Sequence, residues 1–404
     1  MASDSLKEIT EHDFGHIYNC SIESIAVSSK YLFISDTAGR LKQFTQSNTE
    51  LVKNYEKVHK GEIGKIICNE VHLITSDLGG HLKLFSIDQM CLLKDFGKVH
   101  PAGIRAMAIT HDSKQLYVAD LKGHLKCFNL EGAPYNLAKD YGRVHVAPIK
   151  ALSVSPITNY LYSSDMNGLI KQFDTNFVFS DFAYCQIGEI LQICCSNDGK
   201  WLFVSDNLGN VKQWSIKQQE MVKDYGNIHK GRKVQAVICT LDSKYVFSAD
   251  DSGNIKQIDL QRKCIIKDYL QIHQDDIRSL TVSDQFLFSA DYSGCVKQFK
   301  ITNTFLNIAG VASTFLSVLK APGAKDHDDN SLKRSSEVHN ISNSQLLPKP
   351  TVSSRQIVNE NIQKIEQSRA SHRQLLGTGS QDANMKEATT KTETRVSSFG
   401  RGSQ

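Results

Sequence analysis

The chain has 404 residues, of which 40% are hydrophobic and 22% are charged, with 47 Lys and Arg residues against 43 Asp and Glu residues. Residues 302–404 carry 13 of those basic residues but 9 of the acidic ones, so residues 1–301 are neutral and the net charge of +4 lies in the tail. A neutral body argues against a nucleic-acid-binding protein or a protein drawn strongly to membrane surfaces.

The N-terminal sequence MASDSLKEITEHD contains no apolar run of the signal-peptide type, and no long charge-free apolar span occurs later in the chain. The ten cysteines fall mostly in apolar, strand-like runs, as at Cys194 and Cys195, and none forms a CxxC pair. This pattern favours buried, reduced thiols. We therefore expect a cytoplasmic protein without a membrane span.

A seven-fold repeat dominates residues 1–301. In every copy an Asp is followed by a Gly three residues later and by a Lys six residues later. Successive acids are 41 to 45 residues apart, and a period near forty indicates a stack or ring of supersecondary units. The acids are Asp36, Asp77, Asp120, Asp165, Asp206, Asp250 and Asp291.

One copy shows how the unit is built. The segments 104–110, 116–120 and 124–128 are short, largely apolar and separated by turn residues, and a fourth segment ends in KDYGRVH at residue 145. Four short strands in about forty residues are typical of a β-propeller blade. The sequence therefore predicts an all-β, seven-bladed propeller over residues 1–301.

The N-terminal segment HDFGHIY (12–18) resembles KDFGKVH (94–100), which is predicted to belong to the outer strand of a blade. The last unit, 277–299, has three predicted strands and no such segment after it. We predict that the N-terminal strand completes this last blade and closes the ring, which removes an exposed sheet edge.

Five units place a His before the first strand of the unit: His59, His100, His145, His229 and His273. Tyr18 and Gln186 occupy this position in the other two units. These histidines belong to different blades, so they cannot converge on one metal ion. We interpret them as structural residues that bond within their own blade, to the repeat Asp, and we interpret the Lys column as structural too, with a ring of binding lysines as the alternative.

These columns resemble the WD-repeat β-propeller family over about residues 13–301. The family carries a His before the first strand and ends each repeat in Trp-Asp. Here the terminal aromatic is usually Phe, and its Asp survives only as Asp174 and Asp259. The resemblance implies a platform on which other proteins assemble.

The tail changes character after residue 301. Residues 302–322 place apolar side chains along one stripe and are predicted to form an amphipathic helix that ends at Pro322 and Gly323. Residues 323–404 are polar and predicted to be largely disordered. Within them, 355–376 shows heptad-like apolar spacing, which predicts a short partner-binding, coiled-coil-type helix, with plain disorder as the alternative.

The sequence contains no hydrolase, P-loop, metalloprotease or dinucleotide motif, so we predict no catalytic residue, metal, cofactor or small-molecule substrate. We expect a non-enzymatic scaffold for protein–protein interaction. The alternatives are a recognition subunit of a ubiquitin ligase, ciliary or vesicle-transport complex, and an enzyme that uses the central channel. An unsymmetrical polar cluster at the channel mouth would favour the enzyme.

The loops before the first strands are the most varied parts of the units, and loops on a rigid scaffold often carry binding. We predict that basic residues of one loop lie beside acidic residues of the next, with an ordinary solvated rim as the alternative. The predicted partner surface consists of Lys230, Arg232, Lys233, Asp275 and Asp276.

Overall fold

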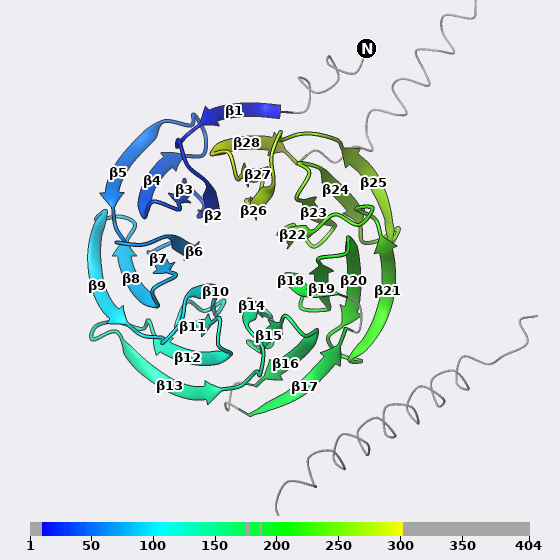
Figure 1. Ribbon diagram of the computed structural model, residues 1–404, viewed down its shortest axis with the longest axis horizontal. Coiled ribbons are helices and arrows are strands. Elements are labelled where there is room, and N and C mark those ends of the chain that lie inside the picture. The colour runs from blue at the N-terminus through cyan, green and yellow to red at the C-terminus, as the bar shows by residue number, and fades with distance from the viewer. Residues whose placement is uncertain (1–9, 175–177, 186–187, 302–404) are drawn as a thin grey trace, which may run out of the picture. The chain divides into compact units, whose positions relative to one another are not determined.

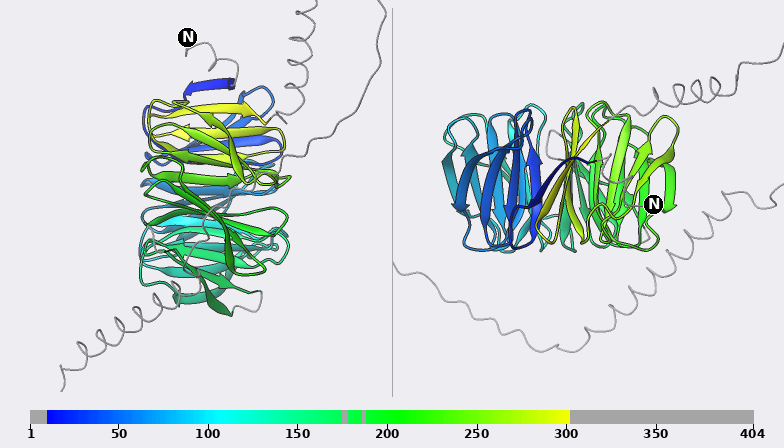
Figure 2. Two further views of the ribbon diagram at one scale, coloured as in Figure 1. Left: turned by 90° about the vertical axis from the view of Figure 1, so that its right-hand side faces the viewer. Right: turned by 90° about the horizontal axis from the view of Figure 1, so that it is seen from above.

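The computed structural model describes residues 10–174, 178–185 and 188–301 of the chain. In these residues, 28 strands form seven four-stranded antiparallel sheets, which stand around one axis as the blades of a propeller (Figure 1). Figure 2 shows the same blades edge-on. The predicted all-β, seven-bladed architecture is therefore confirmed. The predictions for residues 302–404 lie outside the described residues.

Each blade runs from an inner strand at the axis to an outer strand at the circumference. Blade 1 contains β2 (Ile22–Val27), β3 (Tyr31–Asp36), β4 (Arg40–Thr45) and β5 (Leu51–Lys57); blade 2 contains β6 (Ile63–Cys68), β7 (His72–Asp77), β8 (His81–Ser86) and β9 (Cys91–Lys98). Blade 3 contains β10 (Ile104–Ile109), β11 (Gln115–Asp120), β12 (His124–Asn129) and β13 (Asn136–Arg143); blade 4 contains β14 (Ile149–Val154), β15 (Leu161–Asp165), β16 (Leu169–Phe173) and β17 (Phe179–Tyr184).

Blades 5 to 7 complete the ring. Blade 5 contains β18 (Ile190–Cys195), β19 (Trp201–Asp206), β20 (Asn210–Ser215) and β21 (Glu220–Asn227); blade 6 contains β22 (Val234–Cys239), β23 (Tyr245–Asp250), β24 (Ile255–Asp259) and β25 (Cys264–Tyr269). Blade 7 contains β26 (Ile277–Val282), β27 (Phe286–Asp291), β28 (Cys295–Lys300) and the N-terminal strand β1 (Thr10–His16).

The N-terminal strand closes the ring, as predicted. β1 pairs antiparallel with β28, with Asp13 opposite Lys297 and His16 opposite Cys295. The Lys297 ammonium lies 3.3 Å from the Asp13 carboxylate, and the Ile17 N–H donates to the Gly294 carbonyl oxygen at 2.9 Å. The two ends of the propeller sequence are thus held in one sheet.

The hydrophobic core is divided into seven clusters, one between each pair of neighbouring blades. The aliphatic residue two positions after the repeat Gly is at most 1% exposed in every blade, because both faces of each sheet are covered. These residues are Leu41, Leu82, Leu125, Ile170, Val211, Ile255 and Val296.

Aromatic pairs connect most of the neighbouring blades at the circumference. Phe96 of the outer strand of blade 2 lies 5.1 Å from Phe128 of blade 3, centroid to centroid, and Tyr141 of blade 3 lies 5.4 Å from Phe173 of blade 4, both edge-on. The closing strand repeats the pattern, since Phe14 lies 5.8 Å from Phe44 of blade 1. Edge-to-face rings stabilise beyond the apolar area that they bury.

The repeat lysines bind carboxylates within their own blades. Lys83 lies 2.7 Å from Asp95 of the adjacent outer strand, and the same pairing recurs in blades 3 to 7. In blade 1 the outer strand has Asn54 opposite Lys42, and the Lys42 ammonium donates instead to the Ile17 carbonyl oxygen at 3.0 Å. These contacts support the structural interpretation of the column.

All ten cysteines are free. The expectation that they are buried is wrong for Cys91 and Cys264, which are exposed. Both stand at the first position of an outer strand, whose outward side has no further strand to cover it. Cys127, Cys185, Cys195 and Cys239 are buried as expected.

Candidate functional site

The repeat Asp organises the turn that follows it. All seven of these carboxylates are buried, and in every blade the Oδ1 atom accepts the N–H of the residue four positions later at 2.8–3.0 Å. The Gly between them has a φ of +81° to +94°, a conformation that favours glycine. The Asp and the Gly therefore recur because together they build one hairpin turn per blade.

The five histidines lie buried beside these carboxylates. The distance from His Nδ1 to Asp Oδ2 is 2.9 Å for His145, and 2.7 Å for both His229 and His273. It is 3.3 Å for His59 and 3.5 Å for His100. Tyr18, the blade 1 counterpart, donates its hydroxyl to the Ile34 carbonyl oxygen at 3.3 Å, and Gln186 lies outside the described residues.

Each histidine also binds a third group through Nε2. Hydroxyl oxygens occupy this place at 2.6–2.8 Å in four blades, from Thr75, Ser163, Ser248 and Ser289. In blade 3 the Val118 carbonyl oxygen takes it at 3.1 Å. Sequence reasoning missed these hydroxyl groups. A signal was present, because the residue two positions before the repeat Asp is Ser or Thr only in units that have the His.

Three blades thus contain Ser, His and Asp in the connectivity of a hydrolase triad. Each Ser, His and Asp in them is at most 2% exposed. A substrate carbonyl group cannot reach a hydroxyl that is enclosed between two packed blades. The arrangement instead ties the loop before the blade to its second strand.

We expect a strong coupling between His229 and Asp250 in a double-mutant cycle. Replacing either residue by Ala leaves a buried polar partner unsatisfied, which costs about 1–3 kcal/mol of unfolding free energy. Because the two atoms are 2.7 Å apart, the double variant should lose at least about 1 kcal/mol less than the sum. Urea unfolding of the four proteins measures this.

The control pair is His100 and Asp120, whose atoms are 3.5 Å apart, and its coupling should be smaller. Equal couplings would contradict the assigned contacts.

A pH series gives a second check of the contact between His229 and Asp250. Burial by itself raises the pKa of Asp250, but hydrogen bonds from His229 and Asn254 outweigh it, so the pKa is lowered. The stability that Asp250 supplies is therefore present above about pH 3.9 and lost as the pH falls.

The ring has two faces. The upper face carries the loops that lead into the inner strands and the seven Asp-x-x-Gly turns. These loops and turns contact each other: the Tyr292 N–H, for example, donates to the Asp276 carbonyl oxygen at 2.8 Å. The lower face carries the turns between the first two strands of each blade, such as residues 196–200.

All five residues of the predicted partner surface lie in loops of the upper face. Lys230, Arg232 and Lys233 are exposed, whereas Asp275 and Asp276 are half-buried. Burial raises the pKa of Asp276; the nearby Arg278 and Lys233 lower it, while Asp251 and Asp275 raise it. Of the basic loop, Lys233 thus contributes to the electrostatic environment of Asp276, while the joint partner surface stays a prediction.

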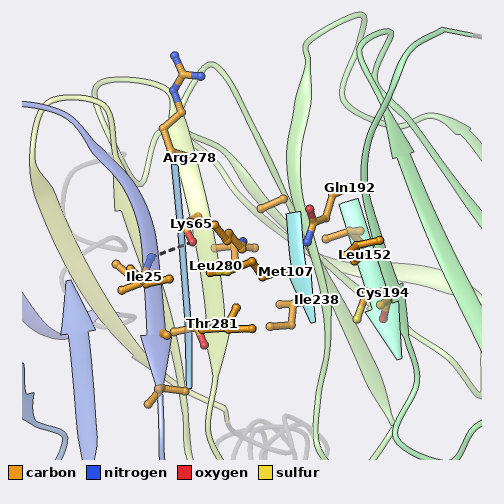
Figure 3. Close-up of a pocket in the computed structure, with 18 of the residues that line it drawn as sticks. Ile25, Lys65, Met107, Leu152, Gln192, Cys194, Ile238, Arg278, Leu280 and Thr281 are labelled. Carbon is orange, nitrogen blue, oxygen red and sulfur yellow. Dashed lines mark hydrogen bonds between the residues drawn. The ribbon is translucent and has the colours of Figure 1, made fainter. Parts of the chain in front are cut away.

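A cavity of about 270 Å³ occupies the central channel and is lined by all seven inner strands. Figure 3 shows apolar side chains around it, including Ile25, Met107 and Leu280, with Lys65 and Gln192 projecting among them. At this position of the inner strand the other five blades have Ser or Ala. The two long polar side chains make the channel unsymmetrical.

Charged side chains crowd the upper mouth of this channel. Arg105 of blade 3 binds Glu62 of blade 2 and Glu23 of blade 1, each at 2.9 Å. Gly64 stands at the equivalent position of the inner strand of blade 2. A Cβ at Gly64 would lie 2.3 Å from the Ile104 carbonyl oxygen and 3.0 Å from a Leu78 methyl carbon.

Lys65 and Lys150 lack a counter-ion, because no carboxylate of the described residues lies within ion-pairing distance of either amine. Burial is the main cause that lowers the pKa of Lys150; Arg105 and Arg278 lower it further, and Glu189 and Glu23 oppose them. These charges come from blades 1, 3, 5 and 7. Burial likewise lowers the pKa of Lys65, opposed by Glu23.

Sequence reasoning did not select the mouth residues. A signal was present, because the second position of the inner strand is charged in four blades, at Glu23, Arg105, Lys150 and Arg278. The described residues contain no group of three or more His, Cys, Asp or Glu side chains placed to hold a metal ion.

Comparison with known proteins adds no closer assignment. No family model matches the chain, and no curated protein matches it. The described residues include no helix with the length and apolarity needed to cross a membrane. The arrangement of seven four-stranded blades is consistent with a WD-repeat-like propeller, a fold that commonly serves in protein interaction.

Proposed function

We propose that the protein is a non-enzymatic scaffold of the WD-repeat type, which binds other proteins through the upper face. One observation carries this proposal: equivalent positions of the seven blades present different charges there. The residue before each inner strand accepts the same turn hydrogen bond through its carbonyl oxygen, yet its side chain changes around the ring. These residues are Ser21, Glu62, Gly103, Pro148, Glu189, Lys233 and Asp276.

A rigid ring with an unsymmetrical charge pattern can accept a partner in one rotational register only, which is what a specific scaffold requires. We also propose the tail, residues 302–404, as an adaptor with a partner-binding helix at 355–376. A recognition subunit of a ubiquitin ligase or transport complex would use the same face. Affinity purification from native cells separates the two by whether one large assembly or several partners are recovered.

An enzyme that uses the channel is the second candidate, and the charge cluster at the mouth favours it, because perturbed groups often mark catalytic sites. Two features favour binding instead. Arg105 engages both Glu23 and Glu62, which leaves neither carboxylate free to act as a base. The cavity of about 270 Å³ is also at the lower limit for a small-molecule pocket.

We expect charge reversal on the upper face to remove at least one native partner while the protein stays folded. The variant carries Arg232→Glu, Lys233→Glu, Asp275→Lys and Asp276→Lys. Affinity purification with quantitative mass spectrometry measures the loss, expected to be at least about tenfold in recovery for a partner whose binding depends on this surface. An unchanged set of partners would contradict the proposal.

The matched control reverses two basic and two acidic residues at the lower face: Lys114, Lys200, Glu131 and Glu220, all exposed. It should keep the upper-face partners. Because Asp276 lies 3.5 Å from Arg278, a milder variant with only Arg232→Glu and Lys233→Glu is tested beside the first. Circular dichroism and thermal unfolding establish that all three proteins are folded.

A further inference from the structure

We propose that the upper mouth of the channel is a carboxylate-binding site, which receives an Asp or Glu side chain from an acidic peptide segment of a partner protein. The site comprises Lys150 and Arg278 at the mouth and Lys65 below them. The inference rests on the proposed function, because it names the chemistry by which the upper face anchors its partner.

The first step of the argument is the missing negative charge. Lys65 lines the cavity of the channel, and Lys150 stands at the second position of the inner strand β14; both are partly buried, and no carboxylate of the described residues lies within ion-pairing distance of either amine. A buried cation without a partner is costly, and such a cation is retained where a ligand supplies the opposite charge. Burial also lowers the pKa of both amines, because it disfavours their charged form.

Arg278 adds a third cation that is incompletely paired. Its Nη2 atom lies 3.5 Å from Asp276 and its guanidinium group lies 4.9 Å from the centre of the Tyr292 ring. Its buried Nε–H has no hydrogen-bond acceptor among the described residues. An unsatisfied buried donor is costly, and hydrogen bonds from Arg to carboxylates are strong, so this guanidinium group favours a carboxylate ligand.

The surroundings favour a single carboxylate over a phosphate group. Glu23, Glu62 and Glu189 lie around the same mouth, and all three act on the charges there. A dianionic phosphate group would meet more repulsion from these acids than a monoanionic carboxylate. Below the mouth the cavity has polar walls, including Lys65 and Gln192, and apolar walls that include Met107, Leu152 and Leu280 and suit the methylene groups of one inserted side chain.

The test uses the full chain and a fluorescein-labelled hexaglutamate peptide, with binding followed by fluorescence anisotropy at several salt concentrations. A hexaglutamine peptide and a serine-phosphorylated peptide without acidic residues are the comparison probes. We expect hexaglutamate to bind and hexaglutamine not to bind. A double variant, Lys65→Met and Lys150→Met, should raise the Kd at least about tenfold, since two charged hydrogen bonds are lost.

The matched control removes two exposed lysines of the lower face, Lys200→Met and Lys244→Met, and should leave the Kd within about twofold, because distant surface charges act weakly. A third variant, Lys230→Met and Lys233→Met, separates the mouth from the outer loops of the upper face. Met keeps the apolar stem of Lys; if the mouth variant still unfolds, Lys65→Gln and Lys150→Gln replace it, and thermal unfolding checks each protein.

Three outcomes would overturn the site: equal binding of hexaglutamate to the mouth variant and the full chain, equal binding of hexaglutamine, or binding of the phosphopeptide alone. The failure of this inference differs from failure of the proposed function. If the mouth variant keeps its affinity for hexaglutamate while charge reversal at Arg232, Lys233, Asp275 and Asp276 still removes a native partner, the scaffold stands without this anchor.

Discussion

A variant that lacks residues 1–16 is expected to aggregate during purification, and its soluble fraction should unfold at a temperature lower by on the order of 10 °C. The deletion removes β1, so the Phe14 ring no longer packs on Phe44, Lys297 loses Asp13, and β28 becomes an exposed edge. An unpaired edge invites pairing with other chains. Scanning calorimetry and size-exclusion chromatography measure both effects.

The control for this deletion removes residues 1–9, which precede β1, and retains the whole paired strand. It should match the full chain in yield and in unfolding temperature. A chain without residues 1–16 that is monomeric and as heat-stable as this control would show that the ring does not depend on its N-terminal strand.

The blade count and the closure could be predicted because each depends on residues that are close in sequence. A turn with Asp120 and Gly123 is built within one hairpin, so its chemistry repeats whenever the hairpin does. The closing strand could be predicted because its sequence resembles that of the outer strand of another blade. The exposed sides of Cys91 and Cys264 were missed, since apolar neighbours in sequence do not reveal which strand of a blade is outermost.

The channel mouth could not be predicted in the same way. Arg105 and Glu23 are 82 residues apart and meet only because the ring brings blades 1 and 3 to one axis. The repeated sequence positions reveal what the seven blades share, whereas the channel mouth consists of positions at which the blades differ. The candidate site is therefore the part of the molecule for which three-dimensional structure was needed.

A glycine replacement in the Asp-x-x-Gly turn should be among the most destabilising single changes in the protein. Gly123 has a φ of +85°, and a Cβ there would lie 2.1 Å from the carbonyl oxygen of His145. Gly123→Ala must therefore displace the loop that holds the buried His145. The variant combines backbone strain at a positive φ with a collision against the His145 carbonyl oxygen. We therefore expect the unfolding free energy to fall by about 4 kcal/mol or more, which is exceptional for a single substitution.

The matched comparison is Gly142→Ala in the same blade. Gly142 also has a positive φ, of +67°, but a Cβ there would meet no atom within 4 Å. Only the backbone strain remains, which costs about 1–2 kcal/mol. Urea unfolding of both variants therefore separates strain from collision. If Gly123→Ala cost no more than Gly142→Ala, the close approach of this turn to the His145 carbonyl oxygen would not be what makes glycine necessary at position 123.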